Sequence, residues 1–237
     1  MRLLLTRPAP DCEHTAALLT ARGHEVIVAP LLRIEPLAEV DLGSGPWAAI
    51  LVTSANAARA IARHRRIADL RGLPVLAVGE RSAQAMRDAG FADVVSAGGG
   101  GGDLMRLAAA RLKPGVTLLH IAGADRAGDI AGDLGAQNFA VSTVVIYRAV
   151  VAAALPGKAA AALAGGIDGV LHFSRRSAEA YVTLARAGGL RDQALRGPVH
   201  FCLSARIAEP LAQAGGAALR VAPQPTEAAL LDLVPAP

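Results

Sequence analysis

Val144-Val145-Ile146-Tyr147-Arg148-Ala149-Val150-Val151 is the stretch that decides the fold, and it lies past the midpoint of a chain of 237 residues. An earlier stretch, Pro30-Leu31-Leu32-Arg33-Ile34-Glu35-Pro36-Leu37, has the same character. Each follows a strand–helix–strand pattern, reaches an arginine in an apolar extended run, and then leaves that pattern. Two such exits, one outbound and one returning, predict a chain that crosses between two lobes twice. A polar side chain at such a crossing would face the cleft between the lobes, so Tyr147 is the leading candidate site residue.

The composition is that of a well-folded globular protein. Hydrophobic residues make up 53% of the chain and aromatic residues only 3%, so Ala, Leu and Val must fill the core. The net charge of +4 comes from 24 basic residues, nearly all arginine, whose planar guanidinium suits carboxylates and phosphates. There is no basic run with interleaved aromatic residues, so we expect no nucleic-acid partner.

Cysteine usage and hydropathy bear on the compartment. Cys12 and Cys202 lie far apart and lack metal-binding spacing, which favours a reduced cytoplasmic setting without a disulfide or zinc site. The apolar run at residues 3–5 is too short for a signal peptide. The longest apolar region, residues 141–164, is interrupted by Arg148, Pro156 and Lys158, so we expect no membrane span.

Expected strands and helices alternate along the whole chain. The expected strands cover residues 2–5, 24–29, 47–52, 74–78, 92–95, 116–121, 140–147, 169–173, 199–203 and 219–221. Helices are expected between them, one of which runs over residues 124–134. This alternation predicts an α/β fold with parallel sheets and helices on both faces.

Two halves of the chain resemble each other. A shift of 115 residues places Leu32-Arg33 on Tyr147-Arg148, and Val52-Thr53-Ser54 similarly matches His172-Phe173-Ser174. We therefore expect two similar parallel-sheet lobes of about five strands each, joined by a two-stranded antiparallel linker.

The two exits suggest how the lobes divide the chain. On this hypothesis the outer lobe comprises residues 1–33 plus 152–237 and the inserted lobe residues 38–146, with residues 34–37 and 147–151 as the linker. A sequential split near residue 115 is the alternative. Because a two-stranded linker has little stability alone, the lobes should move relative to each other.

Candidate ligand-binding residues follow the expected strands. Ligands of open parallel sheets collect at the carboxyl ends of the strands, where hydroxyls and free helix N-terminal amides bind carboxylates or phosphates. The candidates at these turns are Thr6, Arg7, Thr53, Ser54, Gly79, Ser82, Arg126 and Ser174. Helix capping alone would also explain Ser54, Ser82 and Ser174.

The sequence offers little for metal or nucleophilic chemistry. His120, His172 and His200 fall at buried strand positions, where a core histidine is favoured over a metal ligand. No Ser/His/Asp order with a recognised spacing is present. We therefore expect neither a metal site nor nucleophilic hydrolysis.

Several short motifs occur in a fixed order along the chain. They are Leu5-Thr6-Arg7-Pro8, Pro30-Leu31, Glu35-Pro36, Val52-Thr53-Ser54-Ala55-Asn56-Ala57, Ala77-Val78-Gly79, Gly90-Phe91, Val145-Ile146-Tyr147-Arg148, Phe173-Ser174 and Pro225-Thr226-Glu227. No single motif is specific, but the ordered set resembles the uroporphyrinogen-III synthase family over essentially the full length.

The resemblance implies two α/β lobes with the active site between them and no metal or cofactor. Such enzymes take hydroxymethylbilane, a linear tetrapyrrole with eight carboxylates, and eliminate water. They invert the last pyrrole ring and close the macrocycle to uroporphyrinogen III, through an azafulvene cation and a spiro intermediate. Tyr147 matches the family tyrosine proposed as the proton donor. A cytoplasmic monomer with this small-molecule substrate is the expectation.

One departure from the family pattern leaves an alternative open. The family has a Gly-x-x-Thr-Ala turn in both lobes. Here Gly79-Glu80-Arg81-Ser82-Ala83 keeps the glycine and a hydroxyl, whereas Ser204-Ala205-Arg206-Ile207-Ala208 loses both. The alternative function is a catalytically weak relative that binds a tetrapyrrole or another anion as a regulatory protein. A two-lobed nucleotide- or sugar-binding protein is a third reading, but no nucleotide fingerprint supports it.

Overall fold

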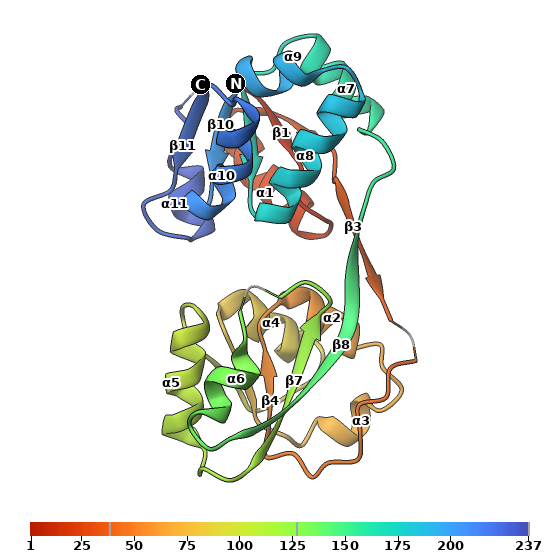
Figure 1. Cartoon of the computed structure of the whole chain (residues 1–237), viewed down its shortest axis with the longest axis vertical. Coiled ribbons are helices and arrows are strands. Elements are labelled where there is room, and N and C mark those ends of the chain that lie inside the picture. Colours follow the sequence, from red (N-terminus) through yellow and green to blue (C-terminus); the bar gives the residue numbers. More distant parts are fainter. Residues whose placement is uncertain (38, 127, 237) are drawn as a thin grey trace. The chain divides into compact units, whose positions relative to one another are not determined.

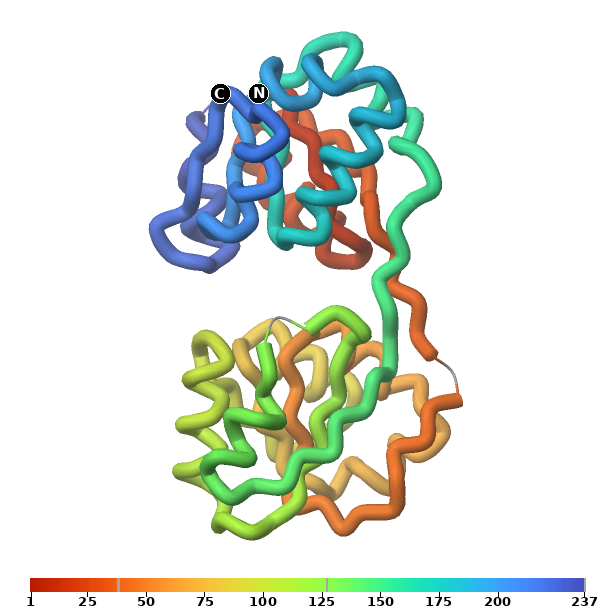
Figure 2. Tube along the Cα trace, viewed as in Figure 1, coloured from red at the N-terminus to blue at the C-terminus, as the bar shows by residue number. Residues whose placement is uncertain are grey.

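The chain divides into two compact units in the computed structural model, which describes residues 1–37, 39–126 and 128–236. Unit 1 combines residues 1–33 with the residues from 150 onward, and unit 2 comprises residues 34–149 (Figure 1). The trace in Figure 2 enters unit 2 once, near its red end, and leaves it once, in green. Unit 2 is therefore contiguous in sequence, and unit 1 is not.

Unit 2 is built on a six-stranded sheet. Its strands, in the order in which they lie side by side, are β3 (Leu32–Pro36), β8 (Ala140–Val151), β7 (Thr117–Gly123), β4 (Ala49–Val52), β5 (Val75–Ala77) and β6 (Val94–Ser96). From β8 to β6 every neighbouring pair is parallel. All four residues of β4 are buried, as expected for a continuous apolar strand covered on both faces.

Helices cover both faces of this sheet. They are α2 (Ala55–Ile61), α3 (Ile67–Leu70), α4 (Glu80–Asp88), α5 (Gly101–Arg111) and α6 (Ile130–Gly135). Successive strand residues point to opposite faces. Thus Ile50 packs in one core cluster with Met86 of α4, and Leu51 packs in another with Leu104 of α5 and Leu134 of α6.

Strand β3 pairs with β8 in the antiparallel direction. The amide of Leu37 donates to the carbonyl of Ile146 (2.8 Å), and the amide of Ala152 donates to the carbonyl of Leu31 (2.9 Å). Residue numbers thus rise along one strand as they fall along the other. The 12-residue β8 outruns its parallel partner β7, and this is why the sheet gains a sixth strand where about five were expected.

Unit 1 is built on a five-stranded, fully parallel sheet. Its strands, in spatial order, are β11 (Ala218–Val221), β10 (Val199–Cys202), β9 (Gly169–His172), β1 (Arg2–Leu5) and β2 (Glu25–Val28). Its helices are α1 (Asp11–Ala21), α7 (Gly157–Ala164), α8 (Arg175–Ala187), α9 (Arg191–Arg196), α10 (Ala205–Ala214) and α11 (Glu227–Leu231). The interior strand β1, between β9 and β2, is almost wholly buried, because three consecutive leucines occupy it.

The two sheets share one strand order. Reading β6-β5-β4-β7-β8 in unit 2 against β11-β10-β9-β1-β2 in unit 1 matches each of these five strands with an equivalent partner, and only β3 among the described strands has none. The two similar sequences Val52-Thr53-Ser54 and His172-Phe173-Ser174 lie at the ends of the equivalent strands β4 and β9. The prediction of an α/β fold with parallel sheets is confirmed.

One predicted helix begins later than expected. The helix expected over residues 124–134 starts only at Ile130, where the carboxylate of Asp129 accepts a hydrogen bond from the amide of Gly132. A capping aspartate fixes the first turn of a helix, so the helix begins after Asp129. The described residues between β7 and α6 therefore form a loop at the carboxyl end of the sheet.

Candidate active site

A pocket of about 340 Å³ lies at the carboxyl end of the unit 2 sheet. The residues that line it follow strands β4, β5 and β7 or belong to β7, β8, α5 and α6. They are Thr53, Ser54, Val78, Gly101, Gly102, Met105, His120, Gly123, Asp125, Arg126, Gly128, Ile130, Asp133 and Tyr147. This is the end of a parallel sheet at which ligands of α/β proteins bind.

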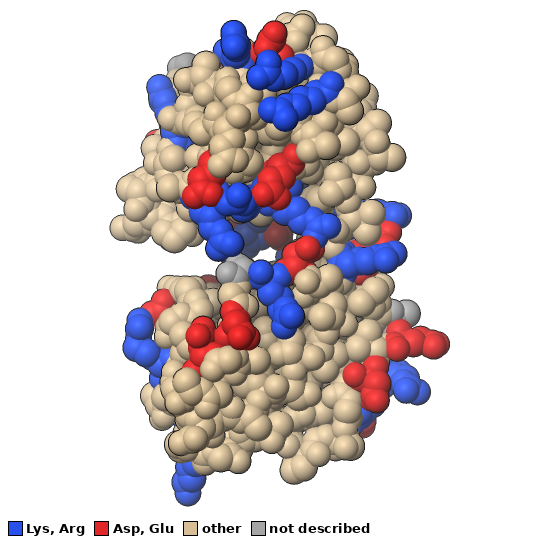
Figure 3. Space-filling model, viewed as in Figure 1, with Lys and Arg blue, Asp and Glu red and all other residues tan. Residues whose placement is uncertain are grey.

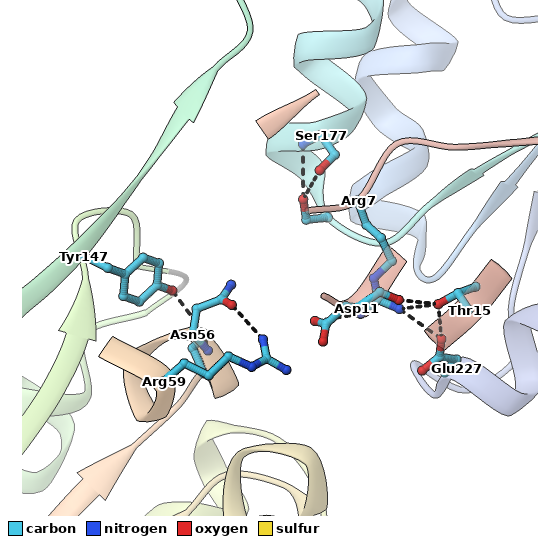
Figure 4. Close-up of polar contacts among 10 residues, drawn as sticks. Arg7, Asp11, Thr15, Asn56, Arg59, Tyr147, Ser177 and Glu227 are labelled. Atoms are coloured by element: carbon cyan, nitrogen blue, oxygen red, sulfur yellow. Dashed lines mark hydrogen bonds and ion pairs between the residues drawn. The ribbon is translucent and has the colours of Figure 1, made fainter. Parts of the chain in front are cut away.

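Tyr147 of β8 reaches this pocket with its hydroxyl. Its side chain is half-buried, and Figure 4 shows the ring pointing toward the start of α2, where Asn56 and Arg59 lie. The phenol donates a hydrogen bond to Ser54 Oγ at 3.0 Å. A phenol held in this way has a defined position and a proton to give.

Ser54 caps the helix that follows β4. Its backbone is extended, with φ at −149°, and its Oγ accepts a hydrogen bond from the amide of Asn56 at 3.1 Å. The alternative raised for this residue, helix capping, is therefore present in the structure. Capping and a role in the pocket coexist, because Oγ also accepts the Tyr147 proton.

His120 is a pocket residue that sequence reasoning took for a core residue. It is only 3% exposed, as its strand position predicted, yet it lines the pocket next to Thr53. Its Nε2 lies 3.5 Å from Thr53 Oγ1 and its Nδ1 lies 3.4 Å from Thr143 Oγ1. Burial, with a smaller contribution from the positive charge of Arg126, lowers the pKa of His120 to about 4.

A neutral imidazole at position 120 therefore links two threonine hydroxyls near pH 7. It holds one ring proton and one lone pair, so it orients the Thr53 hydroxyl that faces the pocket. The signal in the sequence was a lone polar residue three positions before the glycine that ends β7. It was too weak to separate a pocket residue from a core histidine.

The other predicted residues of unit 2 fall into two groups. Thr53 and Arg126 line the pocket, and Arg126 is exposed in the loop between β7 and α6. Gly79 is the N-cap of α4, and Ser82 is buried in the first turn of that helix. Neither Gly79 nor Ser82 is among the residues that line this pocket, whereas their neighbour Val78 is.

The predicted residue Arg7 of unit 1 lies in a network of protein groups. Its guanidinium, in a residue only 6% exposed, donates to Glu227 Oε1 (2.9 Å), Thr15 Oγ1 (2.9 Å) and Asp11 Oδ2 (3.2 Å) (Figure 4). Thr15 Oγ1 in turn donates to Glu227 Oε1. Arg7 also lies over the ring of Phe173, 4.0 Å from its centroid. Two of the ordered motifs, Thr6-Arg7-Pro8 and Pro225-Thr226-Glu227, thus bind each other.

Thr6 and Ser174 also have partners within unit 1. Thr6 is fully buried and its hydroxyl donates to the carbonyl of Leu171 at 3.4 Å. Ser174 is the N-cap of α8, where its Oγ accepts from the amide of Ser177 (3.1 Å) and donates to Ser177 Oγ (2.9 Å). These contacts tie the turns after β1 and β9 into the unit.

The remaining surface shows charges of both signs. On the face drawn in Figure 3, basic and acidic side chains stand next to one another, and uncharged surface covers most of the area. Among the described residues, no group of three or more His, Cys, Asp or Glu side chains is placed to hold a metal ion. None of the helices formed by those residues is long and apolar enough to span a membrane.

Comparison with known proteins places the chain in a family. The family model described as Uroporphyrinogen-III synthase HemD matches residues 13–232. Among curated proteins, no sequence matches.

The solved structures agree in fold. A uroporphyrinogen-III synthetase from Helicobacter pylori is 16% identical with a TM-score of 0.67, and the match covers 98% of each chain. A mutant uroporphyrinogen III synthase from Thermus thermophilus is also 16% identical, with a TM-score of 0.57 and coverage of 98% and 96%. At this identity the solved structures establish a shared fold only. Family membership follows from the family model, which matches most of the sequence. The chain belongs to the uroporphyrinogen-III synthase family of cyclising hydro-lyases in tetrapyrrole biosynthesis.

Proposed function

We propose that Tyr147 is the proton donor of a cyclisation that converts hydroxymethylbilane to uroporphyrinogen III in the unit 2 pocket. The observation that carries this proposal is the Tyr147 phenol, fixed on Ser54 Oγ at 3.0 Å beside a pocket of about 340 Å³. The family supplies the reaction, which expels water from the substrate and closes the macrocycle. A group that gives up a proton in this pocket is what the first step requires.

The first step breaks the bond between the hydroxymethyl carbon and its oxygen. Hydroxide is a poor leaving group, so a proton delivered to that oxygen as the bond breaks lowers the barrier. The oxygen leaves as water with the electron pair, and the pyrrole nitrogen stabilises the azafulvene cation that remains. Tyr147 serves as the acid, and its phenolate is protonated again when the cyclised ring loses a proton.

Positioning supplies the rest of the catalysis. Type I product forms without an enzyme, so the protein must bend the linear substrate until the inverted ring closes faster. Holding two reacting ends in place converts a slow encounter into an intramolecular step. Thr53, oriented by His120, and Arg126 offer a hydroxyl and a cation for substrate carboxylates in the pocket.

The predicted residues outside the pocket receive a different proposal. For Thr6, Arg7 and Ser174 the hydrogen bonds within unit 1 favour a role in holding turns together rather than in binding substrate. Gly79 can offer only its backbone amide, at the start of α4. Ser82 is buried in that helix, which favours support of the turn over contact with a carboxylate.

The two compact units support a functional division of the chain. We propose that residues 1–33 plus 152–237 form one domain and residues 38–146 the other, with residues 34–37 and 147–151 as the linker. We also propose that the protein acts as a monomer. The two buried, free cysteines fit a reduced cytoplasmic environment.

One assay tests the function directly. Purified protein is supplied with hydroxymethylbilane, and the type I and type III products are separated by chromatography. We expect type III product in proportion to protein concentration, with type I product alone in the enzyme-free control. Type I product alone in both samples would contradict the proposal and favour a regulatory protein.

A further inference from the structure

Gly123, the last residue of β7, lies directly against the ring of Tyr147. A Cβ atom built on Gly123 would lie 2.5 Å from Tyr147 Cζ, 2.7 Å from its hydroxyl oxygen and 2.9 Å from Cε1. Non-bonded carbon atoms prefer separations of about 3.5–4.0 Å. The ring end that carries the reactive hydroxyl therefore occupies the volume that any other residue at position 123 would need for its side chain.

Residue 123 must be a glycine because the Tyr147 ring leaves no space for a side chain, and not because of its backbone conformation. Gly123 does not have a positive φ, whereas Gly98 and Gly115 in the same unit do, at +74° and +91°. Only a positive φ makes glycine conformationally necessary. An alanine could adopt the backbone of residue 123, but it could not do so with the phenol where it is.

The backbone around Tyr147 leaves the ring little freedom to move away. The pairing of β7 with β8 runs Ala122 with Val145 and then Gly123 with Tyr147, so Ile146 is an extra residue on β8. Such a β-bulge re-aims a side chain. Adjacent residues of a regular strand face opposite sides, yet Ile146 and Tyr147 both pack against the same core cluster. The carbonyl of Tyr147 also accepts a hydrogen bond from the amide of Ala124 at 2.9 Å.

We propose that Gly123 is a positioning residue for the cyclisation: its missing side chain is what allows the Tyr147 phenol to reach Ser54 and the pocket. An added methyl group must displace the ring by about 1 Å to restore ordinary contact distances. The core cluster lies behind the ring, so the displacement falls on the hydroxyl and its bond to Ser54. This inference rests on the proposed role of Tyr147.

The experiment compares Gly123→Ala with a matched glycine in the same unit. Gly135 ends α6, does not line the pocket, and would meet no atom within 4 Å if it carried a Cβ. A 1 Å displacement of a reacting group costs about 100-fold in rate. We expect Gly123→Ala to lower kcat for type III product about 100-fold with little change in KM, and Gly135→Ala to leave both constants unchanged.

A double mutant shows whether Gly123 acts through the phenol. In the Tyr147→Phe background no hydroxyl remains to be displaced, so adding Gly123→Ala should lower kcat less than about 3-fold further. A loss as large as in the wild-type background, or wild-type kcat in Gly123→Ala alone, would overturn the proposal.

A stability measurement separates this inference from the proposed function. The clash exists only while residue 147 has a ring. Gly123→Ala should therefore lower the Tm in the wild-type background and leave it unchanged in the Tyr147→Ala background, which also provides a folded variant if Gly123→Ala alone unfolds. Suppose that the Tm falls only in the wild-type background and that Tyr147→Phe is fully active. Tyr147 would then have no catalytic role, but the steric contact between Gly123 and the Tyr147 ring would stand. Equal Tm losses in both backgrounds would refute the steric contact between residue 123 and the Tyr147 ring.

Discussion

The two sheets have the same strand order, but the side chains at their carboxyl ends make different contacts. In unit 2 the turns after β4 and β7 open onto a pocket with a phenol at its edge. In unit 1 the equivalent turns after β9 and β1 are tied to each other and to α11, because Arg7 donates to Glu227 of α11 and lies over Phe173. A repeated architecture thus provides two equivalent sheet edges, and their side chains give the two edges different contacts.

The two units also differ in the surroundings of the arginine that follows the equivalent strands β1 and β7. Arg7 is buried among carboxylates of its own unit, whereas Arg126, in the turn after the equivalent strand β7, is exposed at the pocket. A guanidinium already paired with two carboxylates has little attraction left for a third. Four experiments can break or sharpen this contrast.

The largest effect should come from Tyr147, one of the two tyrosines of the chain. Tyr147→Phe removes the proposed general acid, whose contribution is typically about 10²–10⁴-fold, so kcat for type III product should fall by that factor. Tyr181 of unit 1 is the control, since its hydroxyl donates to the carbonyl of Ala194 at 2.8 Å in the core. Tyr181→Phe should keep kcat and lose about 1 kcal/mol of stability. Near-wild-type turnover by Tyr147→Phe would remove that residue from the mechanism.

Acid should destabilise unit 1 more steeply than unit 2, because three buried histidines of unit 1 (His24, His172 and His200) have a lowered pKa, against one (His120) among the described residues of unit 2. His172 and His200 are fully buried, with His172 Nε2 at 3.1 Å from His200 Nδ1. His200 Nε2 faces the carbonyl of Leu195 at 3.4 Å, which can only accept. His200 Nδ1 is therefore the acceptor of the His172 proton. His172 Nδ1 is left as a buried atom without a hydrogen-bond partner in the part of the chain that the structure describes.

Both imidazoles are consequently neutral in the folded protein. Burial lowers the pKa of His200 to about 4, and burial together with the nearby His200 lowers the pKa of His172 well below its usual value. Stability is thus complete above pH 6.5, where unfolded histidine is neutral too, and falls as the pH drops toward 4. His172 and His200 alone contribute a slope of about 2.7 kcal/mol per pH unit, or about 4 kcal/mol lost by pH 5.

Urea titrations between pH 7 and pH 5 measure this loss. His172→Leu should lower the slope for unit 1 by one proton, or about 1.4 kcal/mol per pH unit, whereas substitution of the exposed His14 by Gln should not change it. Unit 2 buries His120, whose pKa is also lowered to about 4, and should show a one-proton slope. Equal slopes for the two units would contradict the assignment.

The arginine contrast gives the third prediction. Arg7→Met removes the cation from a largely buried ion-pair network and should cost about 3 kcal/mol of unfolding free energy. Arg2→Met, which breaks an exposed pair with Glu25, should cost less than about 1 kcal/mol. Denaturant unfolding measures both. A raised KM with unchanged stability in Arg7→Met would instead restore Arg7 as a substrate-binding residue.

The smallest effect concerns the two equivalent N-cap serines. Ser54→Ala and Ser174→Ala should each cost about 1 kcal/mol of stability, since each loses a side-chain hydrogen bond to a helix amide. Only Ser54 accepts the Tyr147 proton, so Ser54→Ala alone should also lower kcat. Thermal unfolding and steady-state kinetics of the two variants separate capping from catalysis. Equal kcat values would show that Ser54 only caps.

Local patterns in the sequence were enough to place most elements. The buried run that ends at Val52 and the serine two residues later predicted both β4 and the start of α2, because continuous apolar runs and capping residues act over a few positions. The same reasoning placed the start of α8 after Ser174. The α/β class followed from the alternation of such signals.

Contacts between residues far apart in the chain could not be predicted from the sequence. Arg7 and Glu227 are 220 residues apart, and no local pattern indicates that one neutralises the other. His120 was correctly expected to be buried, but its place in the pocket depends on a loop whose helix starts at Ile130 rather than at residue 124. The roles of Tyr147 and the other candidate residues remain predictions until the kinetic experiments are done.

The discontinuity of unit 1 has a consequence for synthesis on the ribosome. Unit 2 is contiguous and can fold as soon as residue 149 has emerged, but β1 must wait for β9, one of its two sheet neighbours. At about 5–20 residues per second, the first strand waits roughly 10–30 s for that neighbour. During this interval the edge of β1 that later pairs with β9 is free, and its three leucines are exposed there. The nascent chain should therefore depend on chaperones more at its beginning than in its middle.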